Sequence, residues 1–121
     1  MTQNEIEEIE SALSISLPDD YIVFMDNEFP VGFRGNADSS LWDCATSVIR
    51  RNLELRSPSF FSPWPTDLFF VGDPLTACAY ALRLTDNECI VYWLDHCDTT
   101  QIDGGQPFDK WAKQVLSDYF S

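Results

Sequence analysis

The sequence predicts an α+β domain in which a twisted antiparallel sheet packs against about four helices. The first observation is the stretch 67–95, where three apolar runs are separated by two short polar breaks. The second is the helical spacing of apolar residues near both ends of the chain and over 44–56. Strands and helices are thus grouped along the chain rather than alternating, which favours α+β over a parallel α/β sheet.

The three apolar runs of 67–95 are expected to form a meander. They read DLFFVGD, TACAYALRL and CIVYWLD, and are rich in the β-branched and aromatic residues that strands prefer. The breaks at 73–75 and 85–88 are too short for crossover helices, so neighbouring strands should run antiparallel. In the second run large residues alternate with alanines, which predicts a sheet with one buried face and one partly covered face.

The N-terminal part of the chain is expected to supply two helices. Over 2–14, apolar residues recur at i, i+3 and i+7, and Thr2 with Glu5 has the spacing of a capping box. Pro18 then opens a second helix, at a position where its missing N–H carries no penalty. That helix is expected to end near position 27 or 28.

Two short strands and a third helix are expected before the meander. Residues 29–33 predict an edge strand, because Pro30 is tolerated only at an edge, and 41–42 should return beside it. Asp43 is expected to cap a helix over 44–56. The side chains expected to face inward from this helix are Cys44, Val48, Ile49 and Leu53.

After the meander the sequence predicts a flexible loop and a last helix. Residues 97–106 are polar and contain Gly104-Gly105, which is typical of a loop. Residues 107–120 place aromatic and aliphatic side chains at core spacing. The chain shows no internal repeat, low-complexity tract or linker, so a single domain over 1–121 is expected.

The charge excludes some classes of partner. Twenty acidic and seven basic residues give −13 and a pI near 4.1. Binding to nucleic acid or to an anionic membrane surface needs clustered Lys and Arg, so neither is expected. A basic protein partner would be complementary, although surplus acid can also serve solubility alone. No apolar run approaches the roughly 20 residues of a membrane helix, and no secretory signal is recognisable, so we expect a cytoplasmic protein.

Residues that could carry catalysis or hold a metal are few. The cysteines have no Cys-x-x-Cys spacing and are expected to be reduced, structural thiols. The run Asp95-His96-Cys97-Asp98 offers metal-ligand types, but consecutive residues of an extended chain point to opposite faces. A Cys97–His96 nucleophile pair fails for the same reason. Asp19 and Asp20 are explained as first-turn helix acids. We therefore expect no catalytic residue, metal or cofactor.

A series of short motifs follows the predicted elements in order. They are Leu17-Pro18-x-x-Tyr21 with Phe24, Leu41-Trp42-Asp43 with Asn52, Trp64-Pro65, Phe69-Phe70-Val71-Gly72-Asp73, Tyr80-x-Leu82, Val91-Tyr92-x-x-Asp95-His96 and Phe108-x-x-Trp111. The series resembles the SUKH superfamily, which includes fungal cell-wall-assembly-regulator-like proteins and bacterial immunity proteins. It departs from that pattern at Asn27-Glu28, where the family often has Asn-Gly, and in the turn 73–76, which often holds a second glycine.

The resemblance implies an immunity protein that binds and neutralises one cognate toxin, and it supplies no catalytic motif. Such toxins are often nucleases or other nucleic-acid-modifying enzymes with basic surfaces, which agrees with the acidic charge. The expected partner is therefore a basic toxin, bound by a monomer or weak homodimer. Carboxylates in turns and loops are the candidates for toxin binding, with a plain solvated surface as the alternative. They are Asp73, Asp86, Glu88, Asp95, Asp98 and Asp103.

Two other functions stay open at the level of sequence. A regulatory scaffold or adaptor that binds other proteins without a toxin is the first alternative, since some family members outside bacteria look to act in that way. A metal-dependent or thiol enzyme is the second. Metal content and alkylation of the cysteines would distinguish an enzyme from a binding protein.

Overall fold

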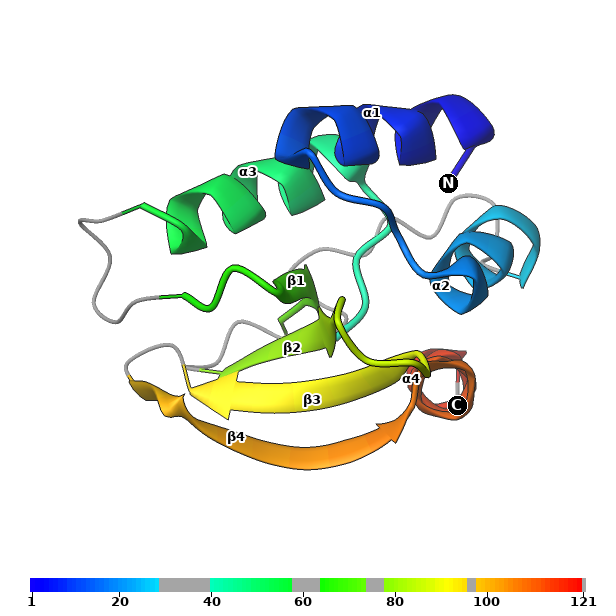
Figure 1. Cartoon of the computed structure of the whole chain (residues 1–121). Coiled ribbons are helices and arrows are strands. Elements are labelled where there is room, and N and C mark those ends of the chain that lie inside the picture. Colours follow the sequence, from blue (N-terminus) through cyan, green and yellow to red (C-terminus); the bar gives the residue numbers. More distant parts are fainter. Residues whose placement is uncertain (29–39, 58–63, 74–77, 96–97, 121) are drawn as a thin grey trace.

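The structure, a computed structural model, describes residues 1–28, 40–57, 64–73, 78–95 and 98–120 (Figure 1). Its helical elements are α1 (Gln3–Leu13), α2 (Asp19–Val23), the π-helix η1 (Phe24–Glu28), α3 (Ala45–Leu55) and α4 (Phe108–Phe120). Its strands are β1 (Leu68–Gly72), β2 (Cys78–Arg83), β3 (Ile90–Asp95) and β4 (Asp98–Pro107). The sheet order is β1-β2-β3-β4 and every neighbouring pair is antiparallel. The predicted α+β class is confirmed.

The helix α1 forms as its sequence predicts. The Thr2 hydroxyl accepts a hydrogen bond from the Glu5 N–H and the Glu5 carboxylate accepts one from the Thr2 N–H, which completes the capping box. All three apolar residues of its stripe are buried: Ile6, Ile9 and Leu13. The Glu10 carboxylate then accepts a hydrogen bond from the Leu17 N–H at 2.8 Å, which fixes the path of the chain toward α2.

The predicted second helix has the expected extent but two different geometries. Pro18 lies at the N-cap, α2 covers one turn, and η1 continues as a π-helix to Glu28. Tyr21 and Phe24 are buried from this segment. The Tyr21 ring packs edge-on against Phe69 of β1, with ring centroids 5.4 Å apart, so the segment is held by aromatic contacts to the sheet.

Three expectations around α3 are wrong. The N-cap is Cys44 rather than Asp43, and the Cys44 side chain makes no capping hydrogen bond. Leu53 is 52% exposed, because the buried stripe passes through residues spaced three and four apart and leaves Leu53 off it. The residues of that stripe are Ala45, Val48, Asn52 and Leu55. Residues 41–42 form no strand; the Trp42 N–H makes one hydrogen bond to the Val71 carbonyl beside the irregularity that ends β1. The predicted strand 29–33 lies outside the described residues.

The meander forms as predicted, and both of its faces are covered. On one face a main core joins the sheet to the helices; its strand residues are Phe69, Val71, Leu82 and Val91. On the other face a smaller core contains Leu55, Trp64, Leu68, Phe70, Ala79, Ala81 and Leu94. Successive strand residues enter opposite cores, as the twofold alternation of a strand requires.

The segment predicted as a flexible loop over 97–106 is instead mostly strand β4, and this prediction is wrong. Among the described strands, β4 pairs only with β3, and this pairing has two shifts of register. Gly104 has a positive φ of 46°. A Cβ on Gly105 would lie 2.9 Å from atoms of both Ile90 and Tyr92, so the glycines fit an irregular strand packed against its neighbour.

The outer edge of β1 is closed by side chains. Asn52 of α3 accepts a hydrogen bond from the Phe70 N–H at 2.9 Å and donates one to the Phe70 carbonyl at 3.1 Å. The Leu68 carbonyl accepts a bond from the Trp64 indole at 3.0 Å. Figure 1 shows α3 running along this edge. No helix among the described residues is long and apolar enough to cross a membrane.

Candidate functional site

A hollow of about 570 Å³ opens where the start of α2 meets the turn between β2 and β3. Its lining residues are Ser16, Pro18, Asp19, Asp20, Leu84, Asp86, Asn87, Glu88, Cys89, Ile90 and Pro107. Four of these carry carboxylates (Asp19, Asp20, Asp86 and Glu88), and none of the lining residues is Lys, Arg or His. We call this feature the acidic hollow.

The α2 side of the acidic hollow comes from the first helical turn. Asp19 and Asp20 follow the N-cap Pro18 and are exposed. Their position suits the helix dipole, which explains both residues in the sequence without a binding role. What the sequence could not give is the tertiary packing that brings the 85–88 turn to face them. The structure therefore adds two acidic residues to the candidates.

The opposite side is a turn whose acid is held in place. The Asp86 N–H bonds the Arg83 carbonyl at 3.2 Å and closes the turn. The Tyr92 hydroxyl donates a hydrogen bond to the Asp86 carboxylate at 2.8 Å, and this bond raises the pKa of Tyr92. The Arg83 guanidinium lies 5.0 Å from the centre of the Tyr92 ring. Asp86 is thus preoriented, while Glu88 is exposed.

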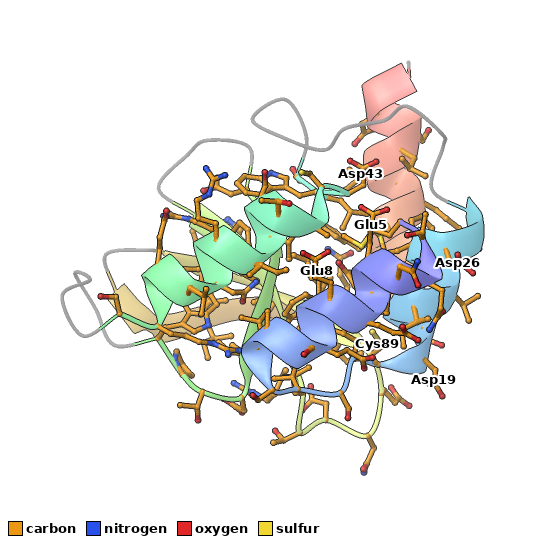
Figure 2. The ribbon with its side chains drawn as sticks, turned by 90° about the horizontal axis from the view of Figure 1, so that it is seen from above. Glu5, Glu8, Asp19, Asp26, Asp43 and Cys89 are labelled. Carbon is orange, nitrogen blue, oxygen red and sulfur yellow. The ribbon has the colours of Figure 1, made fainter. Side chains whose placement is uncertain are left out.

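Cys89 joins three elements at the wall of the acidic hollow. Its carbonyl accepts a hydrogen bond from the Phe108 N–H at the start of α4, at 2.9 Å. Burial, followed by the charges of Asp20 and Asp109, raises the pKa of its thiol to about 12, although the Tyr21 N–H opposes that shift. The thiol is therefore protonated at neutral pH and is a poor nucleophile. Figure 2 shows Cys89 on the same side of the molecule as Asp19.

The acidic hollow belongs to a larger acidic region. The first 28 residues contain eight carboxylates and no Lys or Arg. Figure 2 shows three of these, Glu5, Glu8 and Asp26, on α1 and η1. Glu5 is engaged in the capping box, whereas Glu8 is exposed. A surface with one sign of charge attracts partners of the opposite sign and speeds their encounter.

The six carboxylates predicted from the sequence do not form one cluster. Asp86 and Glu88 line the acidic hollow, but Asp73 is only 4% exposed and is part of the interior. Asp95 and Asp98 are paired at the opposite end of β3, roughly 17 Å along the strand from its first residue. Asp103 of β4 pairs with Trp93 of β3. The side chains of these last three lie outside the described part of the chain.

The residues that the sequence offers for metal binding or nucleophilic catalysis centre on His96 and Cys97. His96 and Cys97 lie outside the described residues. Among those that are described, no group of three or more His, Cys, Asp or Glu side chains is arranged to hold a metal ion. The carboxylates of the acidic hollow come from two separate elements, α2 and the 85–88 turn, an arrangement that suits separate contacts to a basic surface.

Comparison with known proteins supplies a family. The model of the SMI1 / KNR4 family (SUKH-1) matches residues 1–114 of this chain. The family is linked to toxin immunity, and its proteins are typically non-enzymatic. No curated protein and no solved structure matched the chain. The match spans all the elements described above except the last turns of α4.

Proposed function

Because this chain belongs to the SMI1 / KNR4 family (SUKH-1), we propose that it is an immunity protein that binds and neutralises a cognate bacterial toxin. The observation that carries the proposal is the acidic hollow, where four carboxylates from two separate elements face a space of about 570 Å³. A space of this size can admit basic side chains from a protein partner. The proposed activity is binding, with no catalytic step and no cofactor.

The chemistry of the hollow suggests what kind of toxin it binds. Its carboxylates offer acceptors for Lys and Arg side chains, which are the groups that nucleases and other nucleic-acid-modifying enzymes use on phosphates. A toxin that presents those groups around its active or substrate-binding surface would be masked when they enter the hollow. Asp86, held by Tyr92 before binding, loses little freedom on contact.

The charge of the chain also bears on how it acts in the cell. With −13 on each copy, two molecules repel one another, so we propose that a monomer or weak homodimer meets the toxin. The same charge disfavours nucleic acid and anionic membrane surfaces as partners. The proposed place of action is the cytoplasm, where a nucleic-acid-modifying toxin would find its substrate.

Growth rescue with matched variants tests the proposal. Cells that express the toxin encoded by the neighbouring gene would also express the wild-type chain, the pair Asp20→Asn with Glu88→Gln, or the pair Glu54→Gln with Asp118→Asn. Each pair removes two charges, but only the first pair lies in the acidic hollow. We expect rescue by the wild type and the second pair, and clearly weaker rescue by the first.

The same experiment separates immunity from the adaptor alternative. A chain that binds other proteins without opposing a toxin would give no rescue in any form. Rescue that is equal for both pairs would keep the immunity function but move the binding surface away from the acidic hollow. Binding measured in parallel with purified proteins assigns each result to affinity rather than to expression.

A further inference from the structure

The two edges of the sheet differ in whether their outward backbone groups have hydrogen-bond partners. At β1 the outward backbone groups are satisfied by side chains: those of Phe70 by Asn52, and the Leu68 carbonyl by Trp64. An unpaired edge can add a strand from another chain, and natural proteins commonly close it. The β1 edge is closed in this way, so it is unavailable to a partner.

The β4 edge is open over the part that the structure describes. Strand order places β4 at the other end of the sheet, and Figure 1 shows none of the described helices or strands along its outer edge. Among the described residues, no hydrogen bond joins its outer side to another segment. The strand is ten residues long, which is enough to pair with an extended peptide.

Pairing register shows which backbone groups of β4 point outward. The backbone N–H and C=O of Phe70 point away from β2, toward Asn52. Phe70 and Ala81 are therefore a pair without mutual hydrogen bonds, so the backbone N–H and C=O of Ala81 point toward β3. Ala81 pairs with Tyr92, so the backbone N–H and C=O of Tyr92 point back toward β2. The backbone groups of Leu94, two residues later in the same strand, point the same way. Leu94 pairs with Ile102 of β4. The backbone N–H and C=O of Ile102 accordingly point away from β3, while those of Asp103, which pairs with Trp93, point toward β3.

A hollow lined by aromatic residues lies beside this open edge. It has a volume of about 410 Å³ and is lined by Tyr80, Val91, Tyr92, Trp93, Gly104, Gly105 and Gln106. The Tyr80 ring packs against the Trp111 ring, with centroids 4.9 Å apart. When a peptide adds to a sheet edge, alternate side chains fall over the neighbouring face, where such a hollow gives specificity.

Charge determines what kind of strand can add. A second copy of this chain would bring another −13 and its own Asp98 and Asp103 to the same edge. A basic segment would meet complementary charge, and aromatic rings attract Lys and Arg side chains through cation–π contact. We propose that an extended basic segment of the partner adds to β4 as a fifth strand, with one Lys or Arg side chain in the aromatic hollow. This inference rests on the proposed function and assigns that function a second contact.

Hydrogen exchange of the isotope-labelled chain, alone and bound to the toxin from the neighbouring gene, tests strand addition. The amide of Ile102 is expected to exchange about tenfold more slowly in the complex, because its N–H gains a partner. The amide of Asp103, already turned toward β3, serves as the internal control and should change little. Unchanged exchange at Ile102 in a complex that does form would overturn strand addition.

A side-chain variant gives a second readout that leaves the backbone intact. Trp93→Leu removes the ring from the aromatic hollow and is expected to weaken toxin binding about tenfold. Leu53→Ala, an exposed position on α3, is the control and should bind as the wild type does. Wild-type affinity in Trp93→Leu would remove the aromatic hollow from the proposal.

The outcomes distinguish this inference from the proposed function. If the wild-type chain neither binds the toxin nor rescues growth, the immunity function fails and strand addition fails with it. If the chain binds the toxin and rescues growth, but Ile102 exchanges unchanged in the complex and Trp93→Leu binds with wild-type affinity, only strand addition fails. Protection of Ile102 that rises with the concentration of the chain alone would assign the edge to self-pairing and overturn the proposal.

Discussion

At the scale of single residues, the buried side chain of Asn52 shows how one amide can replace a strand. It is fully buried and makes hydrogen bonds to the Phe70 N–H, the Phe70 carbonyl and the Val48 carbonyl. The sequence prediction placed Leu53 in the core instead, because an apolar residue was expected there. A polar side chain that completes a sheet edge leaves no trace in an apolar pattern. Asn52 stands out in the sequence only as part of the family resemblance, and its role at the edge comes from the structure.

Replacing Asn52 tests its role at the β1 edge. Asn52→Leu would leave the Phe70 N–H and C=O buried without partners, so the free energy of unfolding should fall by about 3 kcal/mol. Urea denaturation followed by circular dichroism measures this change. Leu53→Ala, one position away and exposed, should change it by less than about 0.5 kcal/mol. Similar losses in the two variants would contradict the role given to Asn52.

Cys89 gives a prediction about pH. Its pKa is about 12 in the folded chain against an ordinary 9.0, so between those values the unfolded thiol loses its proton first. The unfolded state is then favoured, and stability should fall as pH rises from about 9. Cys89→Ala removes this contribution, so its unfolding free energy should decline less steeply between about pH 8 and pH 10.5. Parallel slopes in the two proteins would show that the thiol ionises alike in both states.

At the scale of elements, the structure explains why the motif over 69–73 contains Gly72. A Cβ at this position would overlap the Ser40 carbonyl oxygen and lie 2.9 Å from the Leu41 Cα. The end of β1 is therefore in direct contact with the backbone of residues 40–41. Both obstacles are backbone atoms and cannot rotate away. The irregularity in the pairing of β1 with β2 falls at the same place.

Two alanine substitutions distinguish a glycine required because a Cβ would clash from a glycine required because its φ is positive. Gly72→Ala should lower the free energy of unfolding by about 3 kcal/mol, because backbone must move to make room. Gly104→Ala has open space and only the positive φ to oppose it, so it should lower the free energy by about 1 kcal/mol. Thermal or urea unfolding of both variants checks the order, and a larger loss in Gly104→Ala would contradict it.

The elements also show where the sequence sufficed. The helices α1 and α4 and the strands β1 to β3 were predicted from periodicity and turn residues, because each buries a regular apolar pattern. For β4 the sequence predicts a loop instead, because an edge strand paired on one side needs no such pattern. Of the four carboxylates that line the acidic hollow, the sequence names Asp86 and Glu88 as candidates, whereas Asp19 and Asp20 join them only through tertiary packing.

At the scale of the whole molecule, two cores share one sheet. The strands contribute to both cores, so neither should persist when the other is lost. We therefore expect the chain to unfold in one cooperative step. Trp111 lies in the main core and Trp64 in the smaller one, so tryptophan fluorescence reports on both. The fluorescence and circular dichroism transitions should coincide in urea, whereas separated midpoints would indicate independent units.

The central claim is that an acidic surface recognises a basic toxin, and its most direct test is the association rate at rising salt. Stopped-flow mixing of the chain with the toxin from the neighbouring gene would measure that rate between low and high ionic strength. Because the attraction acts over about a Debye length, roughly 10 Å at 0.1 M salt, we predict a fall of at least tenfold. A rate that is indifferent to salt would contradict the claim.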